Sequence, residues 1–407
     1  MTATSDIWLS GSAELRLLTA CLIWPDSAVR RARIAEAAAA TQSWDRLVRL
    51  AERHRVLGLV RHGVTSAGLT LPPETARYLA MRAQSVGLDE LRMAGEAVRL
   101  VRLVESAGIK VRVLKGAAVA MLAFGRLGLR FNHDIDILVA PADVARTAEI
   151  LGAAGYRRTE PAADVPEAQL RRWLRDRKDM AYRHETSGTL VELHWRLFDN
   201  PHLLPQLGKT GAQHVDLSAG QSFDTLSDED LPIYLCMHGA QHAWARLKWL
   251  ADFGAWLSAR PPAAIDAFYA RSRSMGAHRA TAPALSLCHE LFDTYLPPEA
   301  ANAMQSSSRM RWLYNVAERC LFGDGEGTEL EDEKFGTTRK NISHYFLATG
   351  LRYRLTEARF DLTDDRDRPI TGAWRALGPF ARPVMWLWRR IFGGGSNDPR
   401  AKPTAAN

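Results

Sequence analysis

Residues 109–140, IKVRVLKGAAVAMLAFGRLGLRFNHDIDILVA, form the segment that decides the fold. The first seven residues alternate apolar and basic side chains, as a half-exposed strand does, and Gly116 ends them. AAVAMLAF then predicts a short apolar helix, and the β-branched run DIDILVA predicts a buried strand. The order strand, helix, strand indicates an α/β unit within the chain.

The α/β unit continues beyond this segment. Pro141 opens a helical stretch that Gly155 ends. DMAYRHE and TLVELHWRL then flank Ser187-Gly188, which predicts a β-hairpin. Before Ile109 and from about residue 226 onward, apolar residues recur at helical spacing, and DLPIYLCMHGAQHAWARLKWLADFGAWLS is one long amphipathic pattern. We therefore expect an α/β (α+β) fold, in which helical regions flank a core with a small mixed sheet.

This pattern divides the chain into five expected parts. They are an N-terminal helical region (1–107), an α/β core (108–225), a C-terminal helical region (226–323), a C-terminal extension (324–393) and a disordered tail (394–407). GDGEGTELEDE predicts a mobile loop. FARPVMWLWRRIF is aromatic and basic, so it suits docking on its own domain or, as the alternative, contact with an acidic membrane surface.

Composition is that of a water-soluble globular protein, with 407 residues, 46% hydrophobic and 24% charged. No apolar run reaches the roughly 20 residues that cross a bilayer, and the first residues lack the pattern of a signal peptide. The four cysteines show no CxxC spacing and predict free thiols in a reducing cytoplasm.

The formal charge is +7, from 53 basic and 46 acidic side chains. This excess favours anionic partners such as nucleotides, although most arginines lie among acidic neighbours on predicted helices. No nucleic-acid-binding motif is present, so nucleic acid is not the expected partner.

The carboxylates of Asp134 and Asp136 carry the chemistry in this sequence. Side chains two residues apart on a strand point to the same face, so the two acids project together. Such a pair repels itself unless cations neutralise it, and Mg²⁺ prefers carboxylate oxygens plus substrate phosphates. Glu192 and His194 repeat this spacing, and Glu192 completes a three-carboxylate cluster if the two strands are neighbours. The simpler alternative makes Asp134 a turn residue and Asp136 a solvated edge charge.

Together these motifs resemble the uncharacterised bacterial nucleotidyltransferases of the DNA polymerase β superfamily. The resemblance rests on strand-LKG-helix, DIDILV, a helix followed by Gly-Tyr, VELHW and HGAQHAWARLKWLADFGAWL, and it covers roughly residues 50–260. It implies two Mg²⁺ ions and transfer of a nucleoside monophosphate from a nucleoside triphosphate such as ATP to an acceptor, with loss of pyrophosphate. It further implies that Asp134, Asp136 and Glu192 hold the metals, and that Glu192 helps to deprotonate the acceptor.

Lys115-Gly116 is a departure from this superfamily, which usually has Gly-Ser at that position. The serine hydroxyl that would contact the triphosphate is therefore missing. Gly116 can still offer a backbone N–H at a helix N-terminus, and Lys115 can add a positive charge. Both residues are thus candidate phosphate-binding groups.

Further candidate nucleotide-binding residues surround these motifs. Arg130 could reach the triphosphate as a planar donor, or it could be a surface-loop arginine. His194, His238 and His242 could face the nucleotide or the acceptor. The last two lie four residues apart as zinc ligands do, but no third ligand follows, so a pocket wall is favoured over zinc and satisfied core histidines remain an alternative.

Lys248 and Asp252 are also four residues apart. A helical ion pair explains this spacing, whereas the resemblance places both in the site with Lys248 near phosphate. Trp244, Trp249 and Trp256 are at helical spacing and predict core packing.

Three functions fit these residues. The favoured one is a nucleotidyltransferase acting on a small molecule or peptide. The second is nucleotidylation of a protein or tRNA, and the third is a non-catalytic nucleotide-binding module. The sequence leaves the nucleobase, the acceptor and the oligomeric state open.

Overall fold

The computed structural model describes residues 12–218, 220–323 and 336–363. The chain forms two compact units, Met1–Thr349 and Gly350–Asn407. In the second unit, the described residues are dominated by helix α17 (Leu351–Thr363). Most of the predicted GDGEGTELEDE loop, the FARPVMWLWRRIF segment and the predicted disordered tail lie outside the described residues. The expected boundaries at 107, 225 and 323 fall within the first unit and stay predictions.

A small mixed sheet lies at the centre of the α/β region, as predicted, and it has five strands. Its order is β1-β2-β5-β4-β3, with β2 parallel to β5 and the other pairs antiparallel. The strands are β1 (Arg112–Val113), β2 (Ile135–Leu138), β3 (Tyr156–Glu160), β4 (Asp179–His184) and β5 (Leu190–His194). A two-stranded antiparallel ribbon, β6 (Ala212–Ser218) with β7 (Gln221–Leu226), packs beside β1 and had no counterpart in the predictions.

The two faces of the sheet differ in polarity. On one face, Ile135 and Ile137 of β2 lie beside Val191 and Leu193 of β5. This face belongs to a buried core with the C-terminal half of helix α6 (Pro73–Ser106) and with helix α8 (Val144–Ala153). The intervening residues of the same strands point to the opposite face. The pleat therefore separates the hydrophobic core from the polar residues of the site.

The predicted strand over 109–115 is much shorter in the structure. Only Arg112 and Val113 pair with β2, opposite Leu138 and Ile137. Beyond these two residues, the Leu114 N–H donates to the Asp136 carbonyl oxygen at 3.0 Å. Ile109 and Val111 are nevertheless buried in the same core, so their apolar character reflects packing rather than strand pairing.

The local elements around the sheet follow the sequence pattern. Helix α7 (Ala117–Phe124) follows Gly116, and the 3-10 turn η1 (Pro141–Asp143) leads into α8. The hairpin between β4 and β5 forms as predicted, with Gly188 at φ 69°, where glycine is favoured. Helix α9 (Glu167–Asp176) precedes β4.

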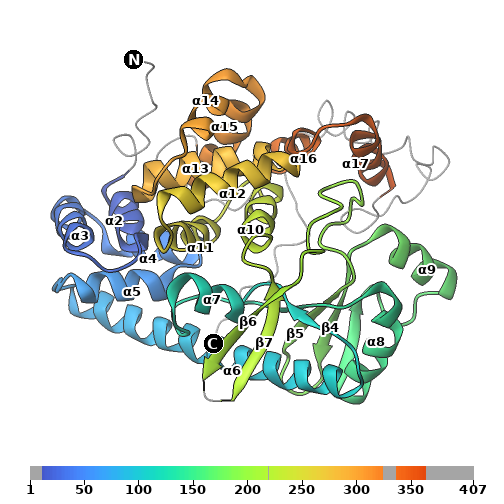
Figure 1. The fold of residues 1–407 in the computed structure, drawn as a ribbon. Coiled ribbons are helices and arrows are strands. Elements are labelled where there is room, and N and C mark those ends of the chain that lie inside the picture. The colour runs from blue at the N-terminus through green and yellow to red at the C-terminus, as the bar shows by residue number, and fades with distance from the viewer. Residues whose placement is uncertain (1–11, 219, 324–335, 364–407) are drawn as a thin grey trace, which may run out of the picture. The chain divides into compact units, whose positions relative to one another are not determined.

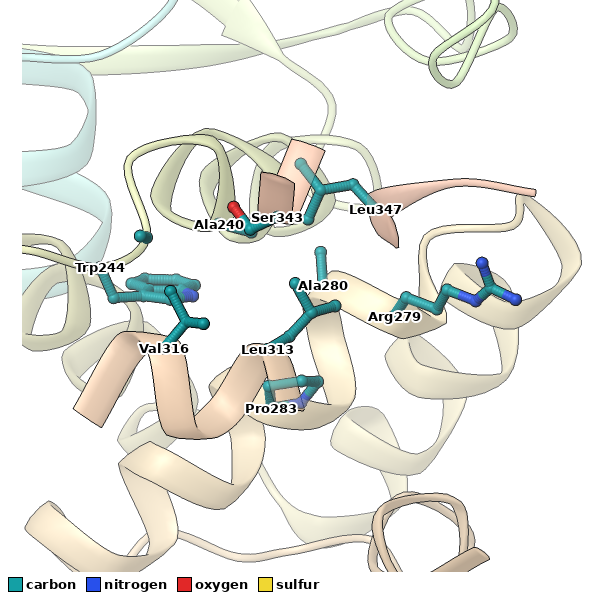
Figure 2. Close-up of a pocket in the computed structure, with 10 residues that line it drawn as sticks. Ala240, Trp244, Arg279, Ala280, Pro283, Leu313, Val316, Ser343 and Leu347 are labelled. Carbon is teal, nitrogen blue, oxygen red and sulfur yellow. The ribbon is translucent and has the colours of Figure 1, made fainter. Parts of the chain in front are cut away.

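In the described chain, helices come before and after the sheet region in the sequence, as expected (Figure 1). The N-terminal ones are α2 (Ala13–Leu22), α3 (Ala28–Ala40), α4 (Trp44–Arg53), α5 (Leu57–Ser66) and α6. The C-terminal ones in the first unit are α10 (Leu231–Gln241), α11 (Leu247–Ser258), α12 (Pro262–Ser274), α13 (His278–Phe292), α14 (Pro298–Ser306), α15 (Ser308–Phe322) and α16 (Gly336–Leu347). Figure 2 shows a small pocket among the C-terminal helices, lined largely by apolar side chains such as Trp244, Pro283 and Leu313.

The long amphipathic pattern over 230–258 forms two helices. The chain turns between α10 and α11, where Ala243 and Trp244 have φ values of 47° and 50°. Gly239 permits the turn, because a Cβ on it would lie 2.4 Å from the Trp244 ring. Trp244 and Trp256 are buried as predicted, whereas Trp249 is only half-buried.

Candidate functional site

Asp136, Glu192 and His194 meet on the polar face of the sheet. His194 Nε2 lies 3.1 Å from Asp136 Oδ1 and 3.2 Å from Glu192 Oε2. The parallel pairing of β2 with β5 places Asp136 directly opposite Glu192, and the two-residue period brings His194 to the same face. The strands are therefore neighbours, as the carboxylate hypothesis requires. Asp136 is buried within an interior strand, so its alternative reading as a solvated edge charge is wrong.

Lys115 forms an ion pair with the buried carboxylate of this cluster. Its Nζ lies 2.9 Å from Asp136 Oδ1. Burial alone would raise the pKa of Asp136, but Lys115 and His194 together hold it well below its usual value. Burial would conversely lower the pKa of Lys115, yet Asp136 and the nearby Tyr234 and Asp134 raise it well above its usual value. The carboxylate and the ammonium are thus both charged.

Asp179 and Lys178 extend the cluster, although sequence reasoning did not single them out. Lys178 Nζ contacts Asp179 Oδ2 and lies 3.9 Å from Glu192 Oε2, while His194 Nε2 lies 3.8 Å from Asp179 Oδ2. Asp179 lies opposite His194 in the β4–β5 hairpin. Counting outward from Ser187-Gly188 would pair Ala181 with His194, whereas the observed register is centred one residue earlier, on Thr186-Ser187, so sequence reasoning does not predict this pairing.

Asp134 immediately precedes β2 and is partly buried. It lines one small cavity with Asp136, Lys115, Gly116 and Asn132. Gly116 has φ 63° and directly precedes α7, a conformation that favours glycine. The predicted phosphate-binding pair therefore adjoins the predicted carboxylate pair. Asp134 lies outside the closest group of donor atoms, which comprises Asp136, Glu192 and His194.

The residues of this cluster fit a divalent cation. Their donor atoms lie within 4.8 Å of one another. Ligands about 2.1 Å from an octahedral cation lie about 3.0 Å from their neighbours, close to the two separations at His194 Nε2. Asp136 Oδ2 is buried without a hydrogen-bond partner, and a buried carboxylate oxygen normally has one. The two carboxylates suit Mg²⁺ or Mn²⁺, with His194 beside them.

Arg130 is buried in a polar network that fixes the loop before β2. Its Nε donates to both carboxylate oxygens of Asp252, at 2.8 and 2.9 Å. The backbone N–H groups of Arg130 and Gly128 donate to Glu90 Oε2 on α6. Two alternatives are therefore wrong: Arg130 is no surface-loop residue, and Asp252 pairs with Arg130 rather than with Lys248.

Lys248 lies at the start of α11 and faces the same loop. Its Nζ donates to the carbonyl oxygen of Phe131 at 3.2 Å and lies 5.9 Å from the Phe131 ring centroid. Burial, together with the nearby charge of Arg130, lowers the pKa of Lys248 to about 7. Asp134 and Lys115 are among its electrostatic neighbours.

His238 and His242 form an aromatic wall with Tyr234 and Trp249. The two imidazole centroids lie 4.7 Å apart, and His242 stacks on Trp249 at 4.9 Å with an interplanar angle of 17°. Burial lowers the pKa of both histidines well below the usual value, and Lys115 contributes in each case. Both rings are therefore neutral. Within the described residues, neither imidazole belongs to a group of three close metal-ligating side chains.

A comparison with protein families gives a match over more than half of the chain. The matching family is described as uncharacterised nucleotidyltransferase, and it covers residues 40–293. The chain belongs to this family. A search of curated proteins found no match.

Membership makes this nucleotidyltransferase a transferase with a nucleoside triphosphate as the expected substrate. Its mixed sheet and flanking helices form the nucleotidyltransferase core and its surroundings, which confirms the predicted fold class. Helix α16 lies beyond the matched residues, yet His344 Nε2 on it lies 2.8 Å from the Gln241 carbonyl oxygen at the end of α10. None of the described helices is both long and apolar enough to cross a membrane.

Proposed function

We propose that this nucleotidyltransferase is metal-dependent and is one of the bacterial nucleotidyltransferases of the DNA polymerase β superfamily. It transfers a nucleoside monophosphate from a nucleoside triphosphate to a small molecule or peptide, in the cytoplasm. The observation that carries the proposal is the meeting of Asp136, Glu192 and His194, with one unpartnered buried oxygen, beside Lys115. Anionic donors gathered next to a lysine suit a metal–triphosphate complex.

Each residue has a proposed role. Asp134, Asp136 and Glu192 hold the cations, two Mg²⁺ ions in the fullest arrangement, with His194 beside them. Bound there, the metal would neutralise charge on the attacking and leaving oxygens of an in-line displacement. Lys115, the Gly116 N–H and Lys248 bind the phosphates.

Other residues shape the site without reaching phosphate. Arg130 and Asp252 position the loop, because the Nε donor of Arg130 is already bound and both side chains are buried. His238, His242 and Trp249 form a wall for the nucleoside or acceptor.

The reaction balances as a substitution at the α-phosphorus. An acceptor oxygen forms a bond to the α-phosphorus, and the bond from the α-phosphorus to the α,β-bridging oxygen breaks. Pyrophosphate leaves with that electron pair. The proton of an acceptor hydroxyl passes to Glu192, the most exposed carboxylate in the close donor group. Positioning and charge neutralisation are expected to supply most of the rate enhancement.

Label transfer tests this proposal. The protein is incubated with Mg²⁺ and each of ATP, CTP, GTP and UTP, labelled at the α- or γ-phosphate, together with size-separated fractions of a cell lysate. We expect label from the α-phosphate in the small-molecule or peptide fraction and release of the γ-label as pyrophosphate. Asp134→Ala/Asp136→Ala should remove the transfer, and full activity in that variant would falsify the assignment. Label on protein or tRNA would support the alternative acceptors instead, and absence of triphosphate binding would favour the non-catalytic module.

A further inference from the structure

We propose that Lys115 is an internal counter-ion, which neutralises Asp136 until metal and nucleotide bind and then moves to the triphosphate. Metal and nucleotide would then bind cooperatively, because each removes an obstacle to the other. This inference rests on the proposed function, since it concerns how the same site is loaded.

The competition follows from the atoms that Lys115 contacts. Lys115 Nζ lies 2.9 Å from Asp136 Oδ1, the same oxygen that lies 3.1 Å from His194 Nε2. The Asp136 side chain is 1% exposed and that of Lys115 is 14% exposed, so little water screens the pair. A divalent cation bound to either oxygen of this carboxylate would sit within a few ångströms of the ammonium. The two positive charges therefore compete for one carboxylate.

The route for Lys115 is set by its place in the chain. It directly precedes Gly116 and the N-terminus of α7, and it lines the cavity shared with Asn132, Asp134 and Asp136. Its four-carbon stem is flexible and carries a compact charge, so the ammonium can turn from Asp136 toward an anion in that cavity. Backbone N–H groups at the start of α7 favour the same anion.

The charges of the site explain why the lysine is needed in both states. Asp134, Asp136, Glu192 and Asp179 are gathered there, and Lys178 is held by Asp179. Without a metal, Lys115 reduces repulsion among these carboxylates. A triphosphate with one divalent cation still carries net negative charge, and the carboxylates would repel it unless a further cation faced its phosphates. Lys115 is the lysine whose ammonium contacts Asp136.

Thermodynamic linkage gives this exchange a measurable signature. Metal alone must break the Lys115–Asp136 pair without giving the ammonium another partner, so it binds weakly. When triphosphate is present, the displaced ammonium gains phosphate oxygens as partners, so metal binds more tightly. Metal in turn raises the affinity for triphosphate by the same factor. A lysine that stayed beside Asp136 would instead leave the effect of triphosphate on metal affinity unchanged when it was removed.

Titration with Mn²⁺ alone tests the exchange, with free Mn²⁺ measured by electron paramagnetic resonance. It is repeated with a non-hydrolysable triphosphate, and triphosphate binding is followed by calorimetry. In Lys115→Met we expect Mn²⁺ alone to bind about tenfold more tightly and triphosphate about tenfold more weakly, as for loss of one charge-assisted contact. The increase in Mn²⁺ affinity caused by triphosphate should shrink at the same time. Lys115→Arg keeps the charge and should retain most of that increase, and the exposed Lys110→Met should behave as wild type.

The outcomes separate the inference from the proposed function. If Mn²⁺ and triphosphate bind to wild type but Lys115→Met leaves Mn²⁺ affinity unchanged or weaker, the exchange is wrong and the metal–triphosphate site stands. If Mn²⁺ binds to no variant, even with triphosphate, both are wrong. Circular dichroism checks that Lys115→Met folds. If Lys115→Met fails to fold, Lys115→Gln takes its place in these titrations. The wild type gives a second test, because independent binding of Mn²⁺ and triphosphate to it would overturn the proposed exchange.

Discussion

At the scale of single residues, Asp136 differs from Asp134 in its surroundings even though both belong to one DxD motif. Asp136 is buried and contacts Lys115 and His194, whereas Asp134 is partly buried at the end of a loop. The sequence places the two acids on one face but does not show which of them is enclosed. Their contributions to function and to stability should therefore separate on mutation.

Asp136→Asn should lower the free energy of unfolding by about 3 kcal/mol, because it leaves the Lys115 ammonium buried without its counter-charge. Asp134→Asn should change it by no more than about 0.5 kcal/mol, as is usual for a residue outside a buried ion pair. Urea unfolding of the two variants measures the difference. Equal losses of unfolding free energy in the two variants would show that the Lys115–Asp136 pair does not stabilise the fold. Both variants should lose transferase activity.

Lys248 should make stability depend on pH. Its folded pKa is lowered to about 7, whereas an unfolded lysine titrates near 10.4. Between these values the unfolded chain binds more protons, so stability rises with pH, by at most about 1.4 kcal/mol per unit. Lys248→Met should therefore be more stable than wild type at pH 6, and the gap should narrow from pH 7 to 9. A gap that stays constant over this range contradicts the lowered pKa.

At the scale of elements, the two-residue periodicity of the sequence predicted which face of a strand each side chain occupies. It placed Asp136 and Glu192 on polar faces and Ile135 and Ile137 in the core, and the hairpin at Ser187-Gly188 brought β4 beside β5. Periodicity does not predict contacts between segments that are distant in the sequence. The pairing of Arg130 with Asp252 joins residues 122 positions apart, and the turn at Ala243 and Trp244 depends on backbone conformations that helical spacing does not reveal.

Helix α5 should be sensitive at Gly58, because it packs on the loop that carries Arg130. A Cβ at Gly58 would lie 2.4 Å from the Leu129 carbonyl oxygen. Gly58→Ala should therefore destabilise the protein by about 1–3 kcal/mol, as overpacking does. Gly95 on α6 is a matched control, because a Cβ there meets nothing within 4 Å. Gly95→Ala should stabilise by about 0.5–1 kcal/mol through helix propensity. Thermal melts of the two variants should move in opposite directions, and shifts of the same sign would contradict this packing.

At the scale of the whole molecule, the family match and the site lie within the first compact unit, Met1–Thr349. A chain ending at Thr349 should therefore keep its melting temperature within a few degrees and bind metal and triphosphate as the full chain does. We also compare how the full chain and the shortened chain bind to vesicles of acidic lipid. This comparison tests whether FARPVMWLWRRIF contacts an acidic membrane surface. Loss of triphosphate binding on truncation would show that residues 350–407 contribute to the site.

The central claim is that Asp136 and its neighbours bind a triphosphate through a divalent cation. Calorimetric titration of a non-hydrolysable nucleoside triphosphate into wild type and Asp136→Asn, each with Mg²⁺ and with a chelator, tests it most directly. The four bases are tried in turn. We predict binding of at least one triphosphate to wild type with Mg²⁺, and a loss of about tenfold or more with chelator or in Asp136→Asn. Equal affinity in all four conditions, or no binding of any base, would contradict the claim.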